Sequence, residues 1–221
     1  MVTAMTNFAR EREAMVERQI AARGIRDPAI LGAFRQVPRH EFVSRENTAA
    51  AYGDHALPIE ASQTISQPYI VALMIEAADI GADDVVLEVG AGSGYAAAVV
   101  SRIARRVVAI ERQQQLVEIA RERLDRLGYR HVSIVAGDGT MGWPDEAPYD
   151  AILAAASGSH VPQPLIDQLA PGGRLVMPVG SPGSNQNLIK ITKATDGTLR
   201  RSELGGVRFV PLIGQEGWSD A

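Results

Sequence analysis

Short apolar runs alternate with amphipathic stretches in the second half of the chain. Five runs have the length of strands: Val85–Val89, Arg106–Ile110, Val132–Ala136, Ala151–Ala155 and Gly173–Val179. Helical patterns lie between or beside them at Tyr95–Ala104, Gln113–Leu127 and Pro164–Leu169. Because the strand candidates show little polar alternation, we expect a parallel sheet that is buried on both faces. This alternation predicts a doubly wound α/β fold.

Two further segments resemble closing strands, possibly antiparallel to each other. They are Leu188–Lys193 and Arg208–Leu212, and they follow the polar loop SPGSNQN. Asp196-Gly197 between them is a typical turn sequence.

The N-terminal part has a different, helical pattern. Phe8–Gly24 is charged and favours a helix, and Gly24 is a stop signal. Its expected buried stripe consists of Met15, Val16, Ile20 and Ala21. Asp27-Pro28 then resembles a cap followed by a first-turn proline, and predicts a short helix through Phe34.

The segment Ser44–Pro68 lacks periodicity, so we expect an irregular arm that leads into a helix over Tyr69–Ala78. A long loop inside a compact domain is often functional. We therefore predict a single domain over residues 1–221. In this prediction residues 8–78 form a helical cap and substrate arm, and residues 79–213 form a cofactor-binding α/β sheet.

Composition narrows the functional classes. Hydrophobic residues make up 46% of the 221 residues, which is enough for a full core. The net charge of −4 gives no general attraction to nucleic acid. The chain has no cysteine, which excludes disulfides and thiolate nucleophiles and is compatible with a reducing cytoplasm. With no signal-peptide pattern, no membrane-spanning run and four scattered histidines, we expect a cytoplasmic protein without a metal site.

The segment Val85–Tyr95, VVLEVGAGSGY, is the main candidate for a ligand site. Gly90, Gly92 and Gly94 follow a strand and open a helix, where small residues let the backbone approach a ligand. Glu88 would repel a pyrophosphate and could pair with a cationic amine. The pattern thus favours S-adenosylmethionine over a dinucleotide, and an ordinary glycine-rich turn is the alternative.

Two further acids occupy the ends of the next two strand candidates. Glu111 could accept hydrogen bonds from both hydroxyls of a ribose, or it could be a surface residue beside Arg112. Asp138, followed by Gly139, could accept a hydrogen bond from an adenine amino group, or could simply form an Asp-Gly turn. Open α/β sheets bind ligands at the carboxyl ends of their strands, where these acids are expected.

The chain resembles the protein-L-isoaspartate O-methyltransferase family over roughly Met15 to Ile213. The motifs that carry the resemblance are VPRHEFV at Val37–Val43, AYGDHALPI at Ala51–Ile59, QTISQP at Gln63–Pro68, VLEVGAGSGY at Val86–Tyr95, GDG at Gly137–Gly139, PYDAIL at Pro148–Leu153, QLAPGGRLVMPVG at Gln168–Gly180 and VRFVPL at Val207–Leu212. Many methyltransferases share the glycine loop, whereas QTISQP with the preceding AYGD and LPI is specific.

The resemblance implies a seven-stranded, mostly parallel, Rossmann-like methyltransferase sheet with an N-terminal helical cap. It also implies S-adenosylmethionine-dependent methylation of the carboxyl group of L-isoaspartyl residues in damaged proteins or peptides, by a monomer. Ser66 matches the active-site serine, and Thr64 and Ile65 would lie with it over the cofactor. Asp54, Thr64 and the segment Val207–Val210 would line the peptide groove.

The chain departs from the family pattern at Glu60 and Ser62, where glycine is common. Both flank the expected substrate loop, so they bear on the acceptor more than on the cofactor. The alternatives are a methyltransferase with another acceptor and a relative that binds cofactor or isoaspartyl peptide without catalysis. A nicotinamide-dependent oxidoreductase is a third alternative, which Glu88 and the glycine spacing oppose.

Overall fold

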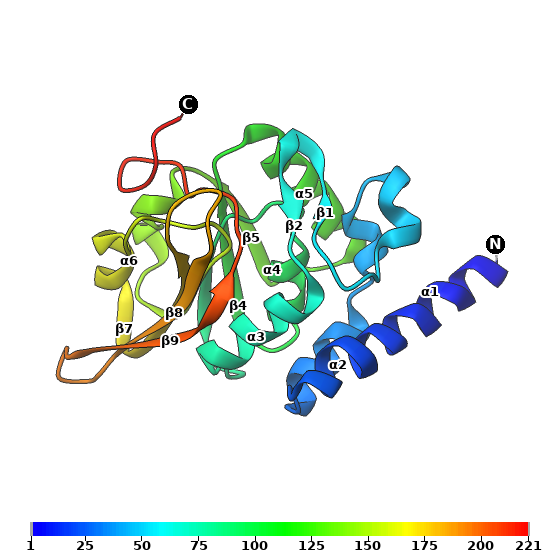
Figure 1. Ribbon diagram of the computed structural model, residues 1–221, viewed down its shortest axis with the longest axis horizontal. Helices are drawn as coiled ribbons and strands as arrows, with labels where there is room; N and C mark the ends of the chain where they lie inside the picture. The colour runs from blue at the N-terminus through cyan, green and yellow to red at the C-terminus, as the bar shows by residue number, and fades with distance from the viewer. Residues whose placement is uncertain (1, 221) are drawn as a thin grey trace.

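A computed structural model describes residues 2–220, with side chains from Asn7 onward. Within this range, seven strands form one sheet in the order β5-β4-β3-β6-β7-β8-β9 (Figure 1). Neighbours from β5 to β7 are parallel, whereas β8 pairs antiparallel with both β7 and β9. The bounds are β3 Val85–Val89, β4 Arg106–Glu111, β5 Val132–Ala136, β6 Tyr149–Ala154, β7 Leu169–Val179, β8 Gln186–Lys193 and β9 Leu199–Val207. The predicted doubly wound, mostly parallel sheet is confirmed.

Alternate residues of the central strands enter two separate hydrophobic clusters. Val86 and Val107 belong to the cluster on one face, and Leu87 and Val108 belong to the cluster on the other. All four side chains are fully buried. Burial on both faces explains why these strands are apolar at nearly every position.

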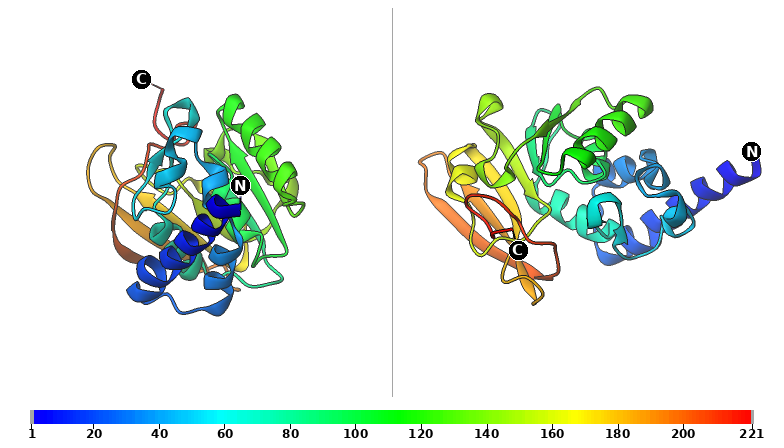
Figure 2. Two further views of the ribbon diagram at one scale, coloured as in Figure 1. Left: turned by 90° about the vertical axis from the view of Figure 1, so that its right-hand side faces the viewer. Right: turned by 90° about the horizontal axis from the view of Figure 1, so that it is seen from above.

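Three helices, together with the N-terminal helices, pack in the cluster on one face of the sheet, and one short helix packs in the cluster on the other. Their bounds are α1 Val2–Met15, α2 Pro28–Gln36, α3 Pro68–Ala78, α4 Tyr95–Val100, α5 Gln114–Leu127 and α6 Gln163–Asp167. The N-terminal helices project from one end of the molecule, and the β8–β9 hairpin lies at the opposite end (Figure 2). Among the described residues, no helix combines the length and apolar character that a membrane span requires.

The N-terminal cap largely follows its sequence pattern. After α1 the chain continues through a π-helical segment, Val16–Ile20, and a 3₁₀ turn that ends at Gly24 with a φ of 105°. Met15, Val16 and Ile20 are buried as predicted, whereas Ala21 is only half-buried. These cap residues share one cluster with α3, α4, α5 and one face of the sheet.

The arm between the cap and α3 is irregular, as predicted, but it contains a short hairpin. Strand β1, Leu57–Pro58, pairs antiparallel with β2, Thr64–Ile65. The connecting turn holds Ala61 and Ser62 at φ values of 53° and 55°. Residues other than glycine rarely adopt this left-handed region of backbone conformation, so the turn is locally strained.

The last predicted strand was misplaced. The chain turns at Asp196-Gly197 as predicted, but the strand that follows is Leu199–Val207, and Arg208–Leu212 forms only an isolated bridge from Pro211 to Ser157. Pro211 has no N–H to donate to a ladder. Strand β9 was not predicted, because its sequence, LRRSELGGV, has no apolar alternation. Such a sequence is typical of an exposed edge strand.

Candidate active site

The glycine loop lies where the sheet order reverses. Strand β3 is paired with β4 on one side and with β6 on the other. Gly90, Gly92 and Gly94 have φ values of 87°, 52° and 84°, a region that favours glycine. The backbone N–H groups of Gly90 and Ala91 donate to the Ile110 carbonyl at 2.9 and 3.1 Å, which ties the loop to β4. Ligands bind at this kind of switch point in open α/β sheets.

Two carboxylates lie beneath and beside this loop. The Glu88 side chain is 2% exposed, and its Oε2 has no hydrogen-bond partner among the described residues. Burial, and then the charge of Glu111, raise the pKa of Glu88 to about 8. Glu111 accepts hydrogen bonds from Gly92 N–H at 3.0 Å and Gln113 N–H at 2.9 Å. Glu111 therefore shapes the loop as well as facing the cavity beside it.

Asp138, at the end of β5, is tied to the C-terminal segment. Its Oδ1 accepts from Thr140 N–H and Oγ1–H, and its Oδ2 accepts from Gln215 N–H at 2.7 Å. Burial alone would raise the pKa of Asp138, but these hydrogen bonds hold it below its ordinary value. Gly139 beside it lies so close to Val89 that a Cβ would come within 2.5 Å of Cγ1.

Two hollows adjoin at the carboxyl ends of the strands. The first, the glycine-loop cavity, has a volume of about 250 Å³, and its lining includes Gly90, Gly92, Glu111 and Gly139. The second, the open groove, has a volume of about 880 Å³ and runs between the arm and the segment 206–210. Thr64, Ala155 and Val210 line both hollows.

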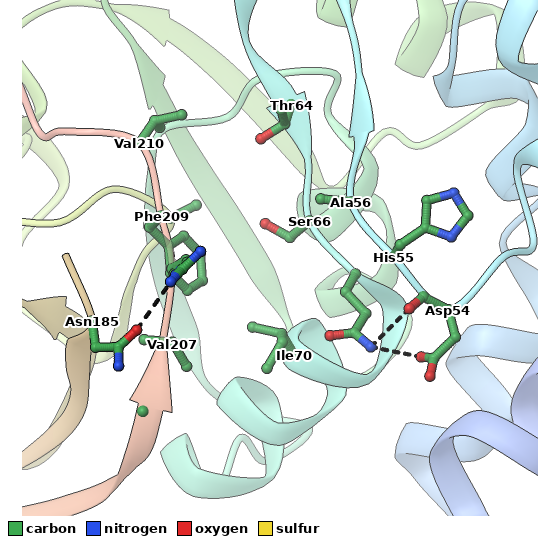
Figure 3. Close-up of a pocket in the computed structure, with 14 residues that line it drawn as sticks. Asp54, His55, Ala56, Thr64, Ser66, Ile70, Asn185, Val207, Phe209 and Val210 are labelled. Carbon is green, nitrogen blue, oxygen red and sulfur yellow. Dashed lines mark hydrogen bonds between the residues drawn. The ribbon is translucent and has the colours of Figure 1, made fainter. Parts of the chain in front are cut away.

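The predicted arm residues lie at this junction. Thr64 is exposed, Ile65 is 4% exposed within the core, and Ser66 is half-buried in the wall of the open groove. The hydroxyl groups of Thr64 and Ser66 point toward the opposite wall, which contains Phe209 and Val210 (Figure 3). Glu88 and Ser66 also line one small cavity of about 30 Å³ under the arm.

The remaining residues predicted for the acceptor lie on the two walls of the open groove, Asp54 on the arm side and the valines on the facing side. Asp54 accepts from Gln67 Nε2 at 2.7 Å and pairs with Arg23 (Figure 3 shows the bond to Gln67). Val207 lines the groove with Val210. Asp138 is set apart from these residues, because it lines a neighbouring hollow with Trp218 rather than the glycine-loop cavity.

The two departures from the family pattern have different surroundings in the structure. Glu60 Oε1 accepts from Arg123 Nη2 on α5 at 2.8 Å, and Glu60 lines neither the open groove nor the glycine-loop cavity. Its carboxylate therefore does not repel an anion in the groove. Ser62, in contrast, lies in the conformation for which glycine is suited.

Sequence reasoning missed several lining residues. Asn185 lines the open groove, and Gln63 and Gln113 line the glycine-loop cavity. Phe209, in contrast, falls within the segment Val207–Val210 that was expected to line the groove, and it does so. Asn185 lies in a polar loop whose pattern carries no signal for a site.

The fold and the glycine-loop site together define a class I methyltransferase, which uses S-adenosylmethionine. Similar solved structures agree with this class. A protein-L-isoaspartate O-methyltransferase superposes with a TM-score of 0.85 at 32% identity, covering 93% of this chain and 67% of the other. A protein-L-isoaspartate O-methyltransferase of Plasmodium falciparum, in complex with S-adenosyl-L-homocysteine, gives a TM-score of 0.78 at 26% identity over 91% of this chain and 98% of its own.

The sequence comparisons identify the family. The model of the protein-L-isoaspartate(D-aspartate) O-methyltransferase family matches residues 10–217. Protein-L-isoaspartate O-methyltransferase 2 of Pelobacter propionicus is 54% identical over 97% of this chain and 95% of its own. The protein-L-isoaspartate O-methyltransferase of Methanoculleus marisnigri is 54% identical over 95% and 94%, respectively. The chain belongs to this family, which rules against the nicotinamide-dependent alternative.

Proposed function

We propose that this protein methylates the free carboxylate of L-isoaspartyl residues in damaged proteins, and that the junction of its two hollows is the reaction centre. The observation that carries this proposal is that Thr64, Ala155 and Val210 line both the glycine-loop cavity and the open groove. A cofactor held in the first hollow would thus face an acceptor held in the second. Ser66 lines the groove beside this junction.

The residues around the glycine loop fit S-adenosylmethionine. Glu88 has a buried oxygen that has no partner among the described residues, and the cationic amine of the cofactor would supply one. The backbone of Gly90, Gly92 and Gly94 lets the methionine part approach closely. Glu111 retains acceptor capacity for ribose hydroxyls after its two backbone hydrogen bonds, because a carboxylate has about four acceptor sites.

We assign the adenine end of the site to Gly139 and to Asp138, which lines the neighbouring hollow next to the glycine-loop cavity. Asp138 already accepts three hydrogen bonds, which leaves about one acceptor site for an adenine amino group. Gly139 lines the glycine-loop cavity directly. The absence of a Cβ at Gly139 keeps the edge of the cavity open next to Val89.

On the acceptor side, the protein mainly has to position a carboxylate. The bound cofactor supplies an electrophilic methyl group on a sulfonium. A carboxylic acid of ordinary pKa is already ionised at neutral pH, so no general base is required. Ser66 donates a hydrogen bond that orients the acceptor, and Thr64 with the backbone at Ile65 completes the pocket. Alignment of this kind contributes on the order of 7–11 kcal/mol to lowering a barrier.

The peptide around the isoaspartyl residue occupies the open groove. Asp54 lies on the arm side, where Gln67 and Arg23 fix its carboxylate. Val207 and Val210 form the facing apolar wall with Phe209. The open shape of the groove suits the irregular surfaces of damaged proteins. Action as a monomer and location in the cytoplasm stay predictions.

A paired-peptide assay tests the proposal. An isoaspartyl peptide and an aspartyl peptide of the same sequence are offered with methyl-labelled cofactor, and label should enter only the isoaspartyl peptide. Equal labelling would contradict the acceptor assignment. Binding of the isoaspartyl peptide without label would instead indicate a non-catalytic relative.

Replacement of the serine tests its role. Ser66→Ala should lower kcat while the Kd for S-adenosylhomocysteine, measured by calorimetry, stays within about threefold. Ser202→Ala provides the matched control, because Ser202 is exposed on β9 and lies outside the lining of both hollows. A large loss of S-adenosylhomocysteine binding in Ser66→Ala alone would assign the residue to the cofactor.

A further inference from the structure

Arg39 is a fully buried cation that the cofactor and acceptor assignments leave unexplained. It opens the 3₁₀ turn Arg39–Phe42, and its exposed fraction is 0%. Among the described residues it forms no salt bridge, and its Nη1 has no hydrogen-bond partner. Removing an unpaired charge from water is costly. A chain that needed only to fill this space could use an apolar side chain.

The guanidinium donates to two points of the arm. Its Nε donates to the Ala51 carbonyl at 2.8 Å, and its Nη2 donates to the Ser66 carbonyl at 2.7 Å. These carbonyls belong to the two sequence segments that form the arm side of the open groove. One fork of fixed geometry therefore sets the distance between them, as a planar guanidinium can and an ammonium cannot.

The same group rests on the cofactor side of the site. The Arg39 Cζ lies 4.7 Å from the centroid of the Tyr95 ring, a cation–π arrangement. Tyr95 is 1% exposed and is the first residue of α4, directly after Gly94 of the glycine loop. Phe42 and Phe34 pack edge-on against its ring at 5.6 and 6.3 Å between centroids, which fixes the ring in place.

We propose that Arg39 is a positioning residue that holds Ser66 in register with the glycine loop. Its guanidinium contacts the backbone of Ser66 on one side and the ring of Tyr95, the first residue of α4, on the other. This inference rests on the proposed role of Ser66. Arg39 lines neither the open groove nor the glycine-loop cavity, so its effect reaches the reaction through the placement of the Ser66 hydroxyl.

Arg39→Lys keeps the charge and removes the fork. Its kcat for the isoaspartyl peptide should fall about 10- to 100-fold, because a misplacement near 1 Å can cost that much. The Kd for S-adenosylhomocysteine should stay within about threefold, since the glycine loop itself is unchanged. Arg35→Lys is the matched control, because Arg35 forms its ion pairs at the surface of α2. Hydrogen exchange of residues 63–67 should be faster in Arg39→Lys only.

A double-mutant cycle separates positioning from general stability. If Arg39 acts through Ser66, Arg39→Lys should lower kcat less than about threefold in a Ser66→Ala background. Multiplicative losses, or wild-type kcat in Arg39→Lys, would overturn the inference and leave the proposed function intact. Full activity of Ser66→Ala would instead refute the role of Ser66, and the inference with it.

Arg39→Gln is the second variant, in case lysine disturbs folding. It should follow Arg39→Lys in kcat, in hydrogen exchange and in the cycle with Ser66→Ala. If neither variant folds well enough to bind S-adenosylhomocysteine, Arg39 is a structural residue and the inference is wrong.

Discussion

Replacing Glu88 by glutamine should stabilise the ligand-free protein while weakening its hold on the cofactor. The Glu88 carboxyl is fully buried, and its pKa rises from an ordinary 4.5 to about 8. Between these values the folded protein keeps a proton that the unfolded chain releases. The unfolded state then binds fewer protons, so the free energy of unfolding falls as pH rises through this window.

The size of the effect follows from the shift. Each pH unit between 4.5 and 8 removes about 1.4 kcal/mol of stability from the wild type, which accumulates to about 3 kcal/mol by pH 7. Glu88→Gln cannot ionise and escapes this loss. Any fixed difference in packing between the two side chains is independent of pH, so the slope of the difference is the decisive quantity.

Urea unfolding at pH 5, 6 and 7, without ligand, measures that slope. The stability of Glu88→Gln minus that of the wild type should grow by roughly 2–3 kcal/mol over this range. Glu122→Gln, exposed on α5, controls for the loss of one carboxylate. A difference that stays constant from pH 5 to pH 7 would refute the reasoning.

Ligand binding provides the complementary readout. An ionised Glu88 pairs with a cationic amine better than a protonated one does, so binding should expel a proton. Calorimetry of S-adenosylhomocysteine at pH 7, in buffers of different ionisation enthalpy, should detect the release of nearly one proton by the wild type. Glu88→Gln should lack this contribution and bind up to about tenfold more weakly, because it loses a buried charge-assisted hydrogen bond worth about 1.5–3 kcal/mol, while ionising Glu88 at pH 7 costs the wild type about 1.4 kcal/mol.

Three further substitutions test other parts of the site. Ser62→Gly should raise the free energy of unfolding, measured by urea titration, by about 0.5–1 kcal/mol. Relief of the left-handed backbone strain should exceed the entropy that glycine adds to the unfolded chain. A loss of stability would contradict the strain. Arg123→Met should lower stability by about 1–3 kcal/mol by leaving Glu60 unpaired, yet keep the KM for the isoaspartyl peptide; a raised KM would place Glu60 in the acceptor site. Trp218→Ala should loosen the C-terminal segment that holds Asp138 and weaken S-adenosylhomocysteine binding about 3- to 10-fold by calorimetry; unchanged affinity would separate that segment from the cofactor.

The sequence predicted those parts of the fold whose cause is local. The central strands are apolar because both faces are buried, and Asp27 and Pro28 signal the start of α2 directly. Edge strand β9 could not be found this way, because its exposed residues are under no hydrophobic constraint. The strained turn at Ser62 was not predicted either, and the only sequence signal for its positive φ was that glycine is common at this position in the family.

The same distinction between local and long-range causes applies to the candidate site. The glycine loop could be predicted because its backbone conformation requires glycine at fixed spacing. Which partner each acid meets depends on contacts between distant residues. Glu60 pairs with Arg123, which is 63 positions away in the sequence. Asp138 accepts a hydrogen bond from the Gln215 N–H, which is 77 positions away. No pattern within one element encodes such pairs, so only the folded structure reveals them.

These long-range contacts also explain how one site can combine a rigid half with an adaptable half. The proposed cofactor residues Glu88 and Glu111 stand on buried strands, whose packing fixes them within the core. The proposed acceptor residues Thr64 and Ser66 stand on an arm whose regular structure is limited to short 3₁₀ segments and one hairpin of two-residue strands, so its shape depends on contacts with its surroundings. Arg39 and the Glu60–Arg123 pair supply such contacts from the cap and from α5. On the proposed assignments, the groove would admit varied peptides at its open side, while these contacts keep Ser66 in register with the cofactor.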